Sequence, residues 1–238
     1  MNEKKSLSEF FTVPGAGILL LCGNEVASFW QLFFIMDYYY TIDTAGSAEF
    51  KDRGSKFLGF AFPVKNKEDF KKHLEALRKE HPKAAHHCFA YRIGLDGNNF
   101  RSSDDGEPSG TAGKQILGHI DSARLCDVLV VVVRYFGGTL LGVPGLINAY
   151  KTAATLALQC SPIVQKPVEV TYTLQFNYTE MNDVMQVLKK YNCTVYKNEM
   201  QLFCKIEAGI PKFRLTEILY GLGNIRNVEI YIAENISK

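Results

Sequence analysis

The stretch that decides the fold runs from residue 127 to residue 135 and reads DVLVVVVRY. Its unbroken run of apolar, mostly β-branched residues predicts a strand that is buried on both faces of a sheet. A strand of this kind lies inside a sheet that other elements cover on both sides. We therefore expect the domain around it to have an α/β architecture.

The segments around this strand alternate between strand and helix periodicity. They predict a strand over 56–64, a helix over 67–80, a strand over 85–95, a helix over 111–120 and a helix from Pro144 to near Gln159. Asn66 offers an N-cap to the first helix. Pro144 suits the first turn of the last helix, because a missing N–H costs nothing there.

The last third of the chain follows a different order. Residues 161–167 read SPIVQKP and, with two prolines, predict a linker between domains. Strand, helix, strand, strand, helix and strand follow over 168–176, 179–191, 193–197, 200–207, 211–222 and 227–233. This β-α-β-β-α-β order is the ferredoxin-like pattern. We expect an α+β protein with an N-terminal domain over 36–160 and a ferredoxin-like domain over 168–238.

Composition narrows the class of protein. The chain has 238 residues, of which 47% are hydrophobic and 22% charged, with a formal net charge of +2. A mostly disordered chain is excluded, and so is the coating of nucleic acid by bulk charge, although a local basic patch can exist within that sum. Six cysteines lie far apart without a C-x-x-C motif. This fits reduced thiols in a cytoplasmic protein.

Residues 1–35 form an atypical apolar extension, in which Glu25 is the only charge between Phe10 and Ile35. Three interpretations stay open: an extension upstream of a true start at Met36, a packed or loose terminal segment, and a membrane or export segment. A membrane span would place Glu25 near mid-bilayer, at a cost of about 2.5–3.5 kcal/mol. We expect no membrane partner.

The loop SSDDGEPSGTAGK, residues 102–114, concentrates polar and glycine residues before a helix. Ser109 or Thr111 could cap that helix, and its free N–H groups together with Lys114 would attract an anion. The spacing fits neither a P-loop nor a nucleophile elbow. The loop is either a structural turn or an anion-binding loop formed by Ser109, Gly110, Thr111 and Gly113.

Two other groups suggest metal ligands but predict no metal site. Three acids lie together at Asp104, Asp105 and Glu107, which is more often a solvated face than a cation site. On a strand, His86 and Cys88 share one face while His87 points to the other, so the three cannot converge. We expect no metal, no cofactor and no nucleophilic catalysis.

The segment RYFGG, from Arg134 to Gly138, ends the core strand and opens into a glycine loop. Functional groups are often placed on such loops. Arg134 could bind a phosphate or carboxylate while Tyr135 stacks on a base, with Gly137 and Gly138 shaping the loop. The alternative is that Arg134 pairs with an internal acid and the aromatic residues fill the core.

These motifs together resemble a known family. GHIDSARLCDVLVVVVRYFGGTLLG (118–142), the upstream SSDDGEPSGTAGKQIL (102–117) and Lys56-Phe57-Leu58 are similar to the hallmarks of the IMPACT/YigZ family. The resemblance covers about Tyr39 to Cys160. It implies an N-terminal fold shared with the second domain of a small-subunit ribosomal protein, and a C-terminal domain similar to the last domain of elongation factor G.

The resemblance also implies a function. Eukaryotic relatives are translational regulators, so we expect a cytoplasmic, non-enzymatic regulator whose partner is RNA, the ribosome or a translation-related protein. Five side chains are expected to contact it: Lys56, Arg92, Lys114, Arg134 and Tyr135. The alternative is a phosphate-ligand-binding protein or a metal-assisted hydrolase that uses the Ser102–Lys114 loop.

Overall fold

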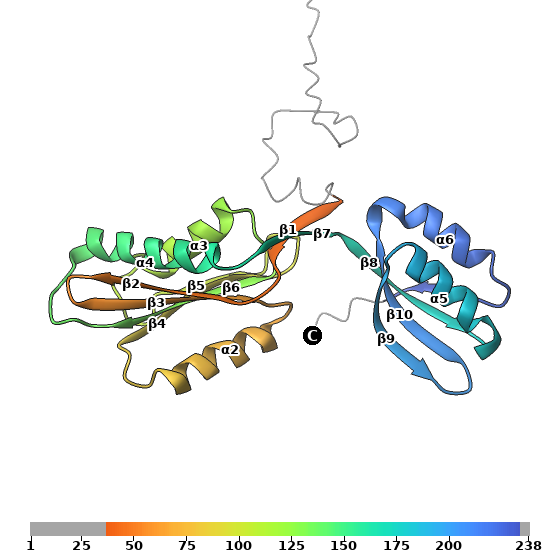
Figure 1. The fold of residues 1–238 in the computed structure, drawn as a ribbon, viewed down its shortest axis with the longest axis horizontal. Helices are drawn as coiled ribbons and strands as arrows, with labels where there is room; N and C mark the ends of the chain where they lie inside the picture. Colours follow the sequence, from red (N-terminus) through yellow and green to blue (C-terminus); the bar gives the residue numbers. More distant parts are fainter. Residues whose placement is uncertain (1–36, 234–238) are drawn as a thin grey trace, which may run out of the picture.

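The computed structural model describes residues 37–233, so the apolar segment before Met36 lies outside the described residues. Two lobes lie at the ends of an elongated molecule, and a narrow two-stranded ribbon joins them (Figure 1). Among the described residues, no helix combines the length and the apolar character needed to cross a membrane.

The first lobe has three layers. A five-stranded sheet with the order β2-β3-β6-β4-β5 lies between α3 and α4 on one face and α2 on the other (Figure 1). Its elements are β2 (Gly46–Asp52), β3 (Ser55–Pro63), α2 (Lys67–Glu80), β4 (His86–Arg92), β5 (Phe100–Ser103), α3 (Gly113–Ser122), β6 (Val128–Tyr135) and α4 (Gly142–Gln159).

Strand β6 is the centre of this lobe. Val128, Val130 and Val132 pack into the core beneath α3 and α4. The alternate residues Leu129, Val131 and Val133 pack into the core beneath α2. The predicted burial of this strand on both faces is confirmed, because each face of the sheet has its own helical layer.

The predicted elements of this lobe agree with the structure at most positions. Helix α2 has the predicted bounds, and Oδ1 of its cap Asn66 accepts from the Asp69 amide at 2.8 Å. Helix α3 begins at Gly113, two residues later than predicted. Strands β2 and β5 were not predicted, since both are edge strands with polar, partly exposed sequences.

Helix α4 packs very closely on β2 and β3 because two glycines leave room for its backbone. A methyl group added at Gly59 would lie 2.4 Å from the Ala153 carbonyl oxygen, and one at Gly46 would lie 2.9 Å from that of Ala157. The helix presents alanines on this side, at 149, 153 and 157, all fully buried. Small residues on both elements therefore set the distance between helix and sheet.

The second lobe has two layers, with α5 and α6 on one face of a four-stranded antiparallel sheet. The strand order β11-β8-β10-β9 agrees with the predicted ferredoxin-like pattern. The elements are β8 (Glu169–Phe176), η1 (Tyr178–Glu180), α5 (Met181–Lys190), β9 (Thr194–Met200), β10 (Cys204–Pro211), η2 (Lys212–Arg214), α6 (Leu215–Gly223) and β11 (Glu229–Ile232).

The turn between β9 and β10 lies further along the chain than predicted. The prediction placed the strands at 193–197 and 200–207, whereas β10 begins only at Cys204. The observed register puts Glu199 opposite Lys205 and Lys197 opposite Glu207. Opposite charges on facing positions favour this pairing.

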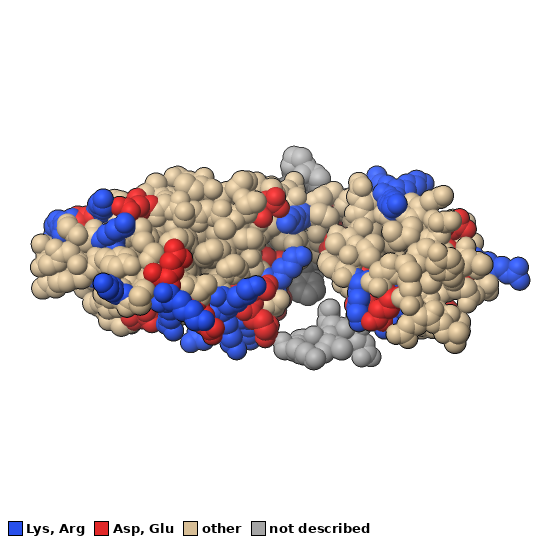
Figure 2. Space-filling model, turned by 60° about the horizontal axis from the view of Figure 1, so that its bottom comes forward, with Lys and Arg blue, Asp and Glu red and all other residues tan. Residues whose placement is uncertain are grey.

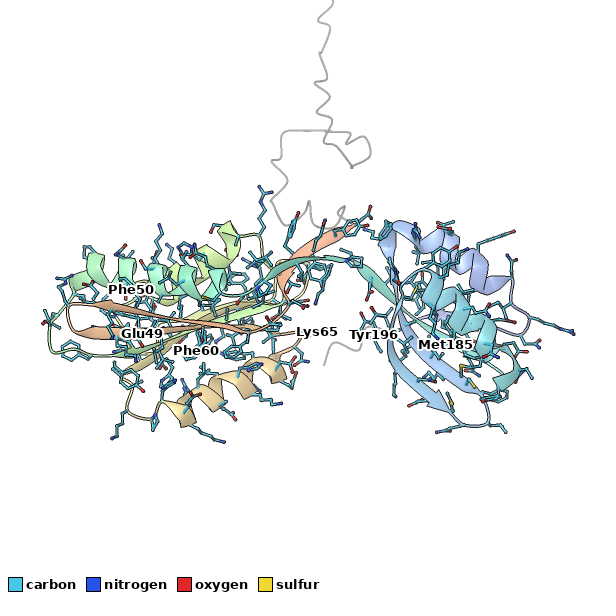
Figure 3. All side chains as sticks on the ribbon, viewed as in Figure 1. Glu49, Phe50, Phe60, Lys65, Met185 and Tyr196 are labelled. Carbon is cyan, nitrogen blue, oxygen red and sulfur yellow. The ribbon has the colours of Figure 1, made fainter. Side chains whose placement is uncertain are left out.

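The predicted linker over 161–167 is mostly strand β7 (Ile163–Pro167), which pairs with β1 (Tyr38–Ile42). Proline at position 162 precedes β7 and proline at 167 ends it, so neither interrupts the ribbon. Contacts at the junction join the lobes further: the Tyr38 ring stacks on Phe213 at 5.1 Å, and Lys65 lies 5.8 Å from the centre of the Tyr196 ring (Figure 3).

Substitution of Gly59 tests the close packing of α4. Gly59→Ala should lower the free energy of unfolding by about 1–3 kcal/mol, because the methyl group meets backbone. Gly118→Ala is the control, since this exposed glycine within α3 has no atom within 4 Å of the added carbon. It should raise stability by up to about 1 kcal/mol. Urea unfolding measures both, and equal effects would contradict the packing described here.

Candidate functional site

Three neighbouring strands bring Phe57, Arg134 and His86 side by side at one end of the first sheet. In the antiparallel register, Arg134 of β6 lies opposite Phe57 of β3 on one side and His86 of β4 on the other. Arg134 is only 5% exposed, and its guanidinium carbon lies 5.4 Å from the centre of the Phe57 ring. A charge buried this deeply requires a partner of opposite sign.

Glu107 is that partner. Nη1 of Arg134 donates to Oε1 of Glu107 at 2.5 Å, and the Glu107 side chain is 3% exposed. The Tyr150 hydroxyl of α4 donates to the same oxygen at 2.8 Å. Glu107 thus joins the loop after β5, strand β6 and helix α4 at one point. Of the two alternatives for Arg134, the internal ion pair is the one that the structure shows.

The glycine loop after β6 is tied to the same cluster. Nη2 of Arg134 lies 3.5 Å from Oγ of Ser55, which also accepts from the Gly137 amide at 3.2 Å. A side chain at Gly137 would collide with the backbone of Gly54. Gly138 has a φ of +85°, which favours glycine. The close approach at Gly137 and the positive φ at Gly138 both restrict the conformation of this loop.

Two protonated groups fill the space beneath the ion pair. Burial raises the pKa of both the Tyr150 hydroxyl and the Cys88 thiol above their ordinary values. The thiol lies 2.9 Å from the Asp104 carbonyl oxygen and 3.3 Å from the Tyr150 hydroxyl. Both groups therefore keep their protons at neutral pH, and Cys88 acts as a structural residue rather than a nucleophile.

The amides of the predicted anion-binding loop are bonded to a carboxylate of the protein itself. Asp104 accepts from the amide of Gly110 at 2.9 Å, of Ala112 at 2.9 Å and of Gly113 at 2.8 Å. Burial alone would raise the pKa of Asp104, but these three donors outweigh it and hold the pKa below its ordinary value. An external anion would have to displace this side chain.

The same contacts correct the predicted cap of α3. From the sequence, Ser109 or Thr111 could cap the helix, but the N-cap position is Ala112, whose side chain makes no capping bond. Ser109 is exposed, and the Thr111 hydroxyl donates to the Pro108 carbonyl at 2.7 Å. Asp104 performs the capping from nine residues upstream of Gly113, a distance that local cap patterns do not cover.

A pocket of about 510 Å³ lies over the ion pair. Its polar wall consists of His86, Glu107 and Arg134. Its rim is apolar and comes from the loop between β6 and α4, where Phe136 is 51% exposed and Leu140 is 83% exposed. Leu141, Val143 and Leu146 complete the apolar side. A buried polar wall beside exposed apolar side chains is typical of a ligand-binding site.

The structure does not bring the five predicted contact residues together. Arg92 is buried at the opposite end of β4 and pairs with Asp121 at 2.7 Å. Lys56 pairs with Glu49 at 2.6 Å, and Lys114 is exposed on the first turn of α3. Tyr135 faces away from Arg134, and its hydroxyl lies 3.0 Å from Nδ1 of His81.

The side chains at the start of β4 alternate between the two faces of the sheet, as predicted. His86 and Cys88 face the loop of residues 102–110, whereas His87 is buried on the α2 side, where burial lowers its pKa. Asp105 pairs with Arg78 at 3.0 Å. Within residues 37–233, no group of three or more His, Cys, Asp or Glu side chains is placed to hold a metal ion.

The prediction missed a basic surface on α2 and its flanks. Residues 65–83 contain seven Lys or Arg and four acidic residues, and all seven basic side chains are exposed. Figure 2 shows Lys and Arg side chains gathered, with acidic ones between them, on the side of the first lobe where α2 lies. Helix α2 itself has five basic and four acidic residues, and Lys65 and Lys83 on its flanks raise the local excess, which was the signal in a nearly neutral chain. The basic residues are Lys65, Lys67, Lys71, Lys72, Arg78, Lys79 and Lys83.

Comparison with known proteins places this lobe in a family. Residues 53–158 match the family described as the Impact N-terminal domain. The chain is 33% identical over 165 residues to the IMPACT family member YigZ of Escherichia coli, covering 68% of this chain and 81% of that protein. The chain belongs to the IMPACT family.

Other members show how far the likeness extends. The Protein IMPACT homolog of Saccharomyces cerevisiae is 38% identical over 96 residues, which covers 38% of this IMPACT chain and 36% of the yeast protein. A crystal structure of a hypothetical protein covers 84% of this chain and 99% of its own, with a TM-score of 0.67 at 28% identity. The likeness to this solved structure therefore includes both lobes.

The buried ion pair of this IMPACT chain predicts that the free energy of unfolding depends strongly on both partners. Glu107→Leu should lower the free energy of unfolding by about 3–5 kcal/mol, because it leaves Arg134 charged, buried and unpaired. Glu107→Leu combined with Arg134→Met should restore much of that loss, and urea unfolding measures each variant. Glu199→Ala is the control, since its exposed pair with Lys197 should contribute less than about 1 kcal/mol. Equal costs for Glu107→Leu and Glu199→Ala would rule out this role.

The Asp104 cap predicts that the stability difference between the wild type and a variant without this carboxylate depends on pH. The folded-state pKa lies below the ordinary value of 3.8, so the carboxylate stabilises the fold above that pH, and this contribution disappears as the pH falls through the folded-state pKa. Asp104→Asn should cost about 1–3 kcal/mol at pH 7. Unfolding of wild type and variant from pH 7 to pH 2 should show the difference shrinking below pH 3.8. A constant difference would contradict the charged cap.

Proposed function

We propose that this chain is a cytoplasmic, non-enzymatic regulator of translation that binds structured RNA through α2. The observation that carries the proposal is the set of seven exposed basic side chains over residues 65–83, against four acidic ones. Phosphate groups on nucleic acid supply the main attraction for such a surface. The excess of basic residues over 65–83 is local, because the whole chain carries only +2.

A local basic surface and a small net charge favour placed contacts over general coating of RNA. A helix presents side chains at a spacing of 1.5 Å per residue, so lysines along α2 can follow successive phosphates. Lys114, exposed on α3, is a further candidate. In this proposal Arg92 and Arg134 shape the lobe through their internal pairs rather than touching RNA.

The family supports a partner in translation. IMPACT proteins include eukaryotic translational regulators, as the sequence resemblance implied. We also propose that the first lobe shares its fold with the second domain of a small-subunit ribosomal protein, and that the second lobe is similar to the last domain of elongation factor G. Both of those domains belong to proteins that work on the ribosome, which favours ribosomal RNA as the partner.

Charge reversal on α2 tests the proposal. Lys71→Glu with Lys72→Glu should weaken binding to a ribosomal RNA fragment by about tenfold or more, because both lysines would otherwise attract phosphate. The slope of log affinity against log salt should also become shallower, by about 0.7–0.9 for each phosphate that the variant no longer neutralises. Fluorescence anisotropy over a range of salt concentrations measures both quantities.

The matched control is Lys189→Glu with Lys190→Glu, an adjacent pair of exposed lysines on α5. This variant changes the net charge by the same amount and should leave affinity and salt slope close to wild type. Equal weakening by the two variants would show that binding responds to overall charge and not to α2. No binding by the wild-type chain at low salt would overturn the function itself.

A further inference from the structure

We infer that the pocket over the Glu107–Arg134 pair receives one unpaired nucleobase, with guanine preferred. The inference rests on the proposed function, because it names the part of an RNA that leaves the basic surface of α2 and enters the first lobe. The pocket is formed by other residues than those of α2, so the pocket and the RNA-binding function can fail separately.

The polar wall of the pocket offers acceptors. The hydrogen bonds and ion pairs that the described residues make with the Glu107 carboxylate all use Oε1, so Oε2 can accept from another donor. Nδ1 of His86 lies 2.8 Å from the Asp105 carbonyl oxygen, which can only accept, so Nδ1 carries the proton of the neutral ring. Nε2 of His86 is then a second acceptor, 3.7 Å from Oε1 of Glu107.

The charge of this wall favours a neutral ligand edge at the two acceptors. Arg134 cancels the charge of Glu107, so an external cation gains little there and an anion would face two acceptors. The ligand edge must therefore carry neutral N–H donors. Guanine has two adjacent donors on its Watson–Crick edge, the ring N1–H and the 2-amino group, which match the two acceptors better than the single amino group of adenine or cytosine does.

The apolar rim provides the stacking surface for a planar base. Phe136 is 51% exposed, and its ring centre lies 5.6 Å from the guanidinium carbon of Arg134, which holds the ring over the mouth of the pocket. Leu140 extends the apolar surface and is 83% exposed. Aromatic side chains bind unpaired bases by stacking, and exposed rings at a pocket mouth are suited to it.

Helix α4 supplies a place for the phosphate of that nucleotide. Its amino end, at Gly142 and Val143, lines the same pocket. The N-cap residue Leu141 makes no side-chain capping bond, and the first turn contains no acidic residue. The positive end of an 18-residue helix therefore faces the pocket.

The pocket lies at the same end of the sheet as the last turn of α2. Arg78 of that turn pairs with Asp105 at 3.0 Å, and Glu107 follows two residues later. His81, just after α2, lies against Tyr135, next to Arg134 in the chain. A strand of RNA bound along α2 would therefore reach the pocket by continuing past Arg78.

The test compares short labelled oligouridines that carry one central guanine, adenine, cytosine or uridine, together with the four nucleoside monophosphates. Binding to the full chain is measured by anisotropy for the oligonucleotides and by calorimetry for the monophosphates. The guanine oligonucleotide should bind about tenfold tighter than the uridine one, as expected for one seated base. Phe136→Ala should remove that preference, and Leu140→Ala should reduce it.

Phe100→Ala is the matched control. Phe100 is also 51% exposed and also lies over a buried arginine, 5.0 Å from the guanidinium carbon of Arg92, but it does not line the pocket. This variant should keep the guanine preference. Lys71→Glu with Lys72→Glu should weaken all four oligonucleotides together and keep their ranking.

The outcomes separate the pocket from the proposed function. Salt-dependent binding of every oligonucleotide without a base preference, or a preference that survives both Phe136→Ala and Leu140→Ala, overturns the pocket and leaves the function standing. Guanosine monophosphate bound in a manner that depends on Phe136, with no binding of the oligonucleotides or of the ribosomal RNA fragment, supports the pocket for a free nucleotide and overturns the RNA function.

Discussion

The ion pair between Glu107 and Arg134 is almost fully buried, so each charge depends on the other for its compensation. Three parts of the first lobe meet at this pair: the loop that carries Glu107, the central strand that ends in Arg134, and α4 through the Tyr150 hydroxyl. The position of the glycine loop after β6 follows from it as well, because Ser55 bridges Arg134 and Gly137. Because the pair is buried, its contribution is to fix this geometry and not to attract a charged partner.

The first lobe therefore has two distinct surfaces, a neutral pocket and a basic surface on and beside α2. The charges inside the lobe cancel and leave a neutral, acceptor-lined pocket beneath an apolar rim. An exposed excess of basic side chains lies instead on α2 and its flanks, over residues 65–83. In the proposed function, attraction for phosphate and selection of a base come from separate residues, which meet where Arg78 contacts Asp105. A protein with a net charge of only +2 can bind RNA selectively in this way.

Sequence periodicity predicted most of the fold, and it was most accurate where burial dictates the pattern. The valine strand and α2 are examples, since their side chains must alternate or recur to fill a core. The edge strands β2 and β5 carry polar, partly exposed residues and gave no such signal. The site was harder to predict, because Glu107 and Arg134 lie 27 positions apart and Asp104 caps a helix from a distance. Such contacts depend on tertiary structure.

The central claim is that RNA is received by the first lobe, along α2 and at the pocket mouth. Amide chemical shifts of the isotope-labelled chain, followed by nuclear magnetic resonance while a guanine-containing oligonucleotide is added, test it most directly. The account predicts shifts that concentrate over residues 65–83 and 136–143, with little change in the sheet of the second lobe. Shifts confined to β8, β9, β10 and β11, with α2 and the pocket loop unchanged, would contradict it.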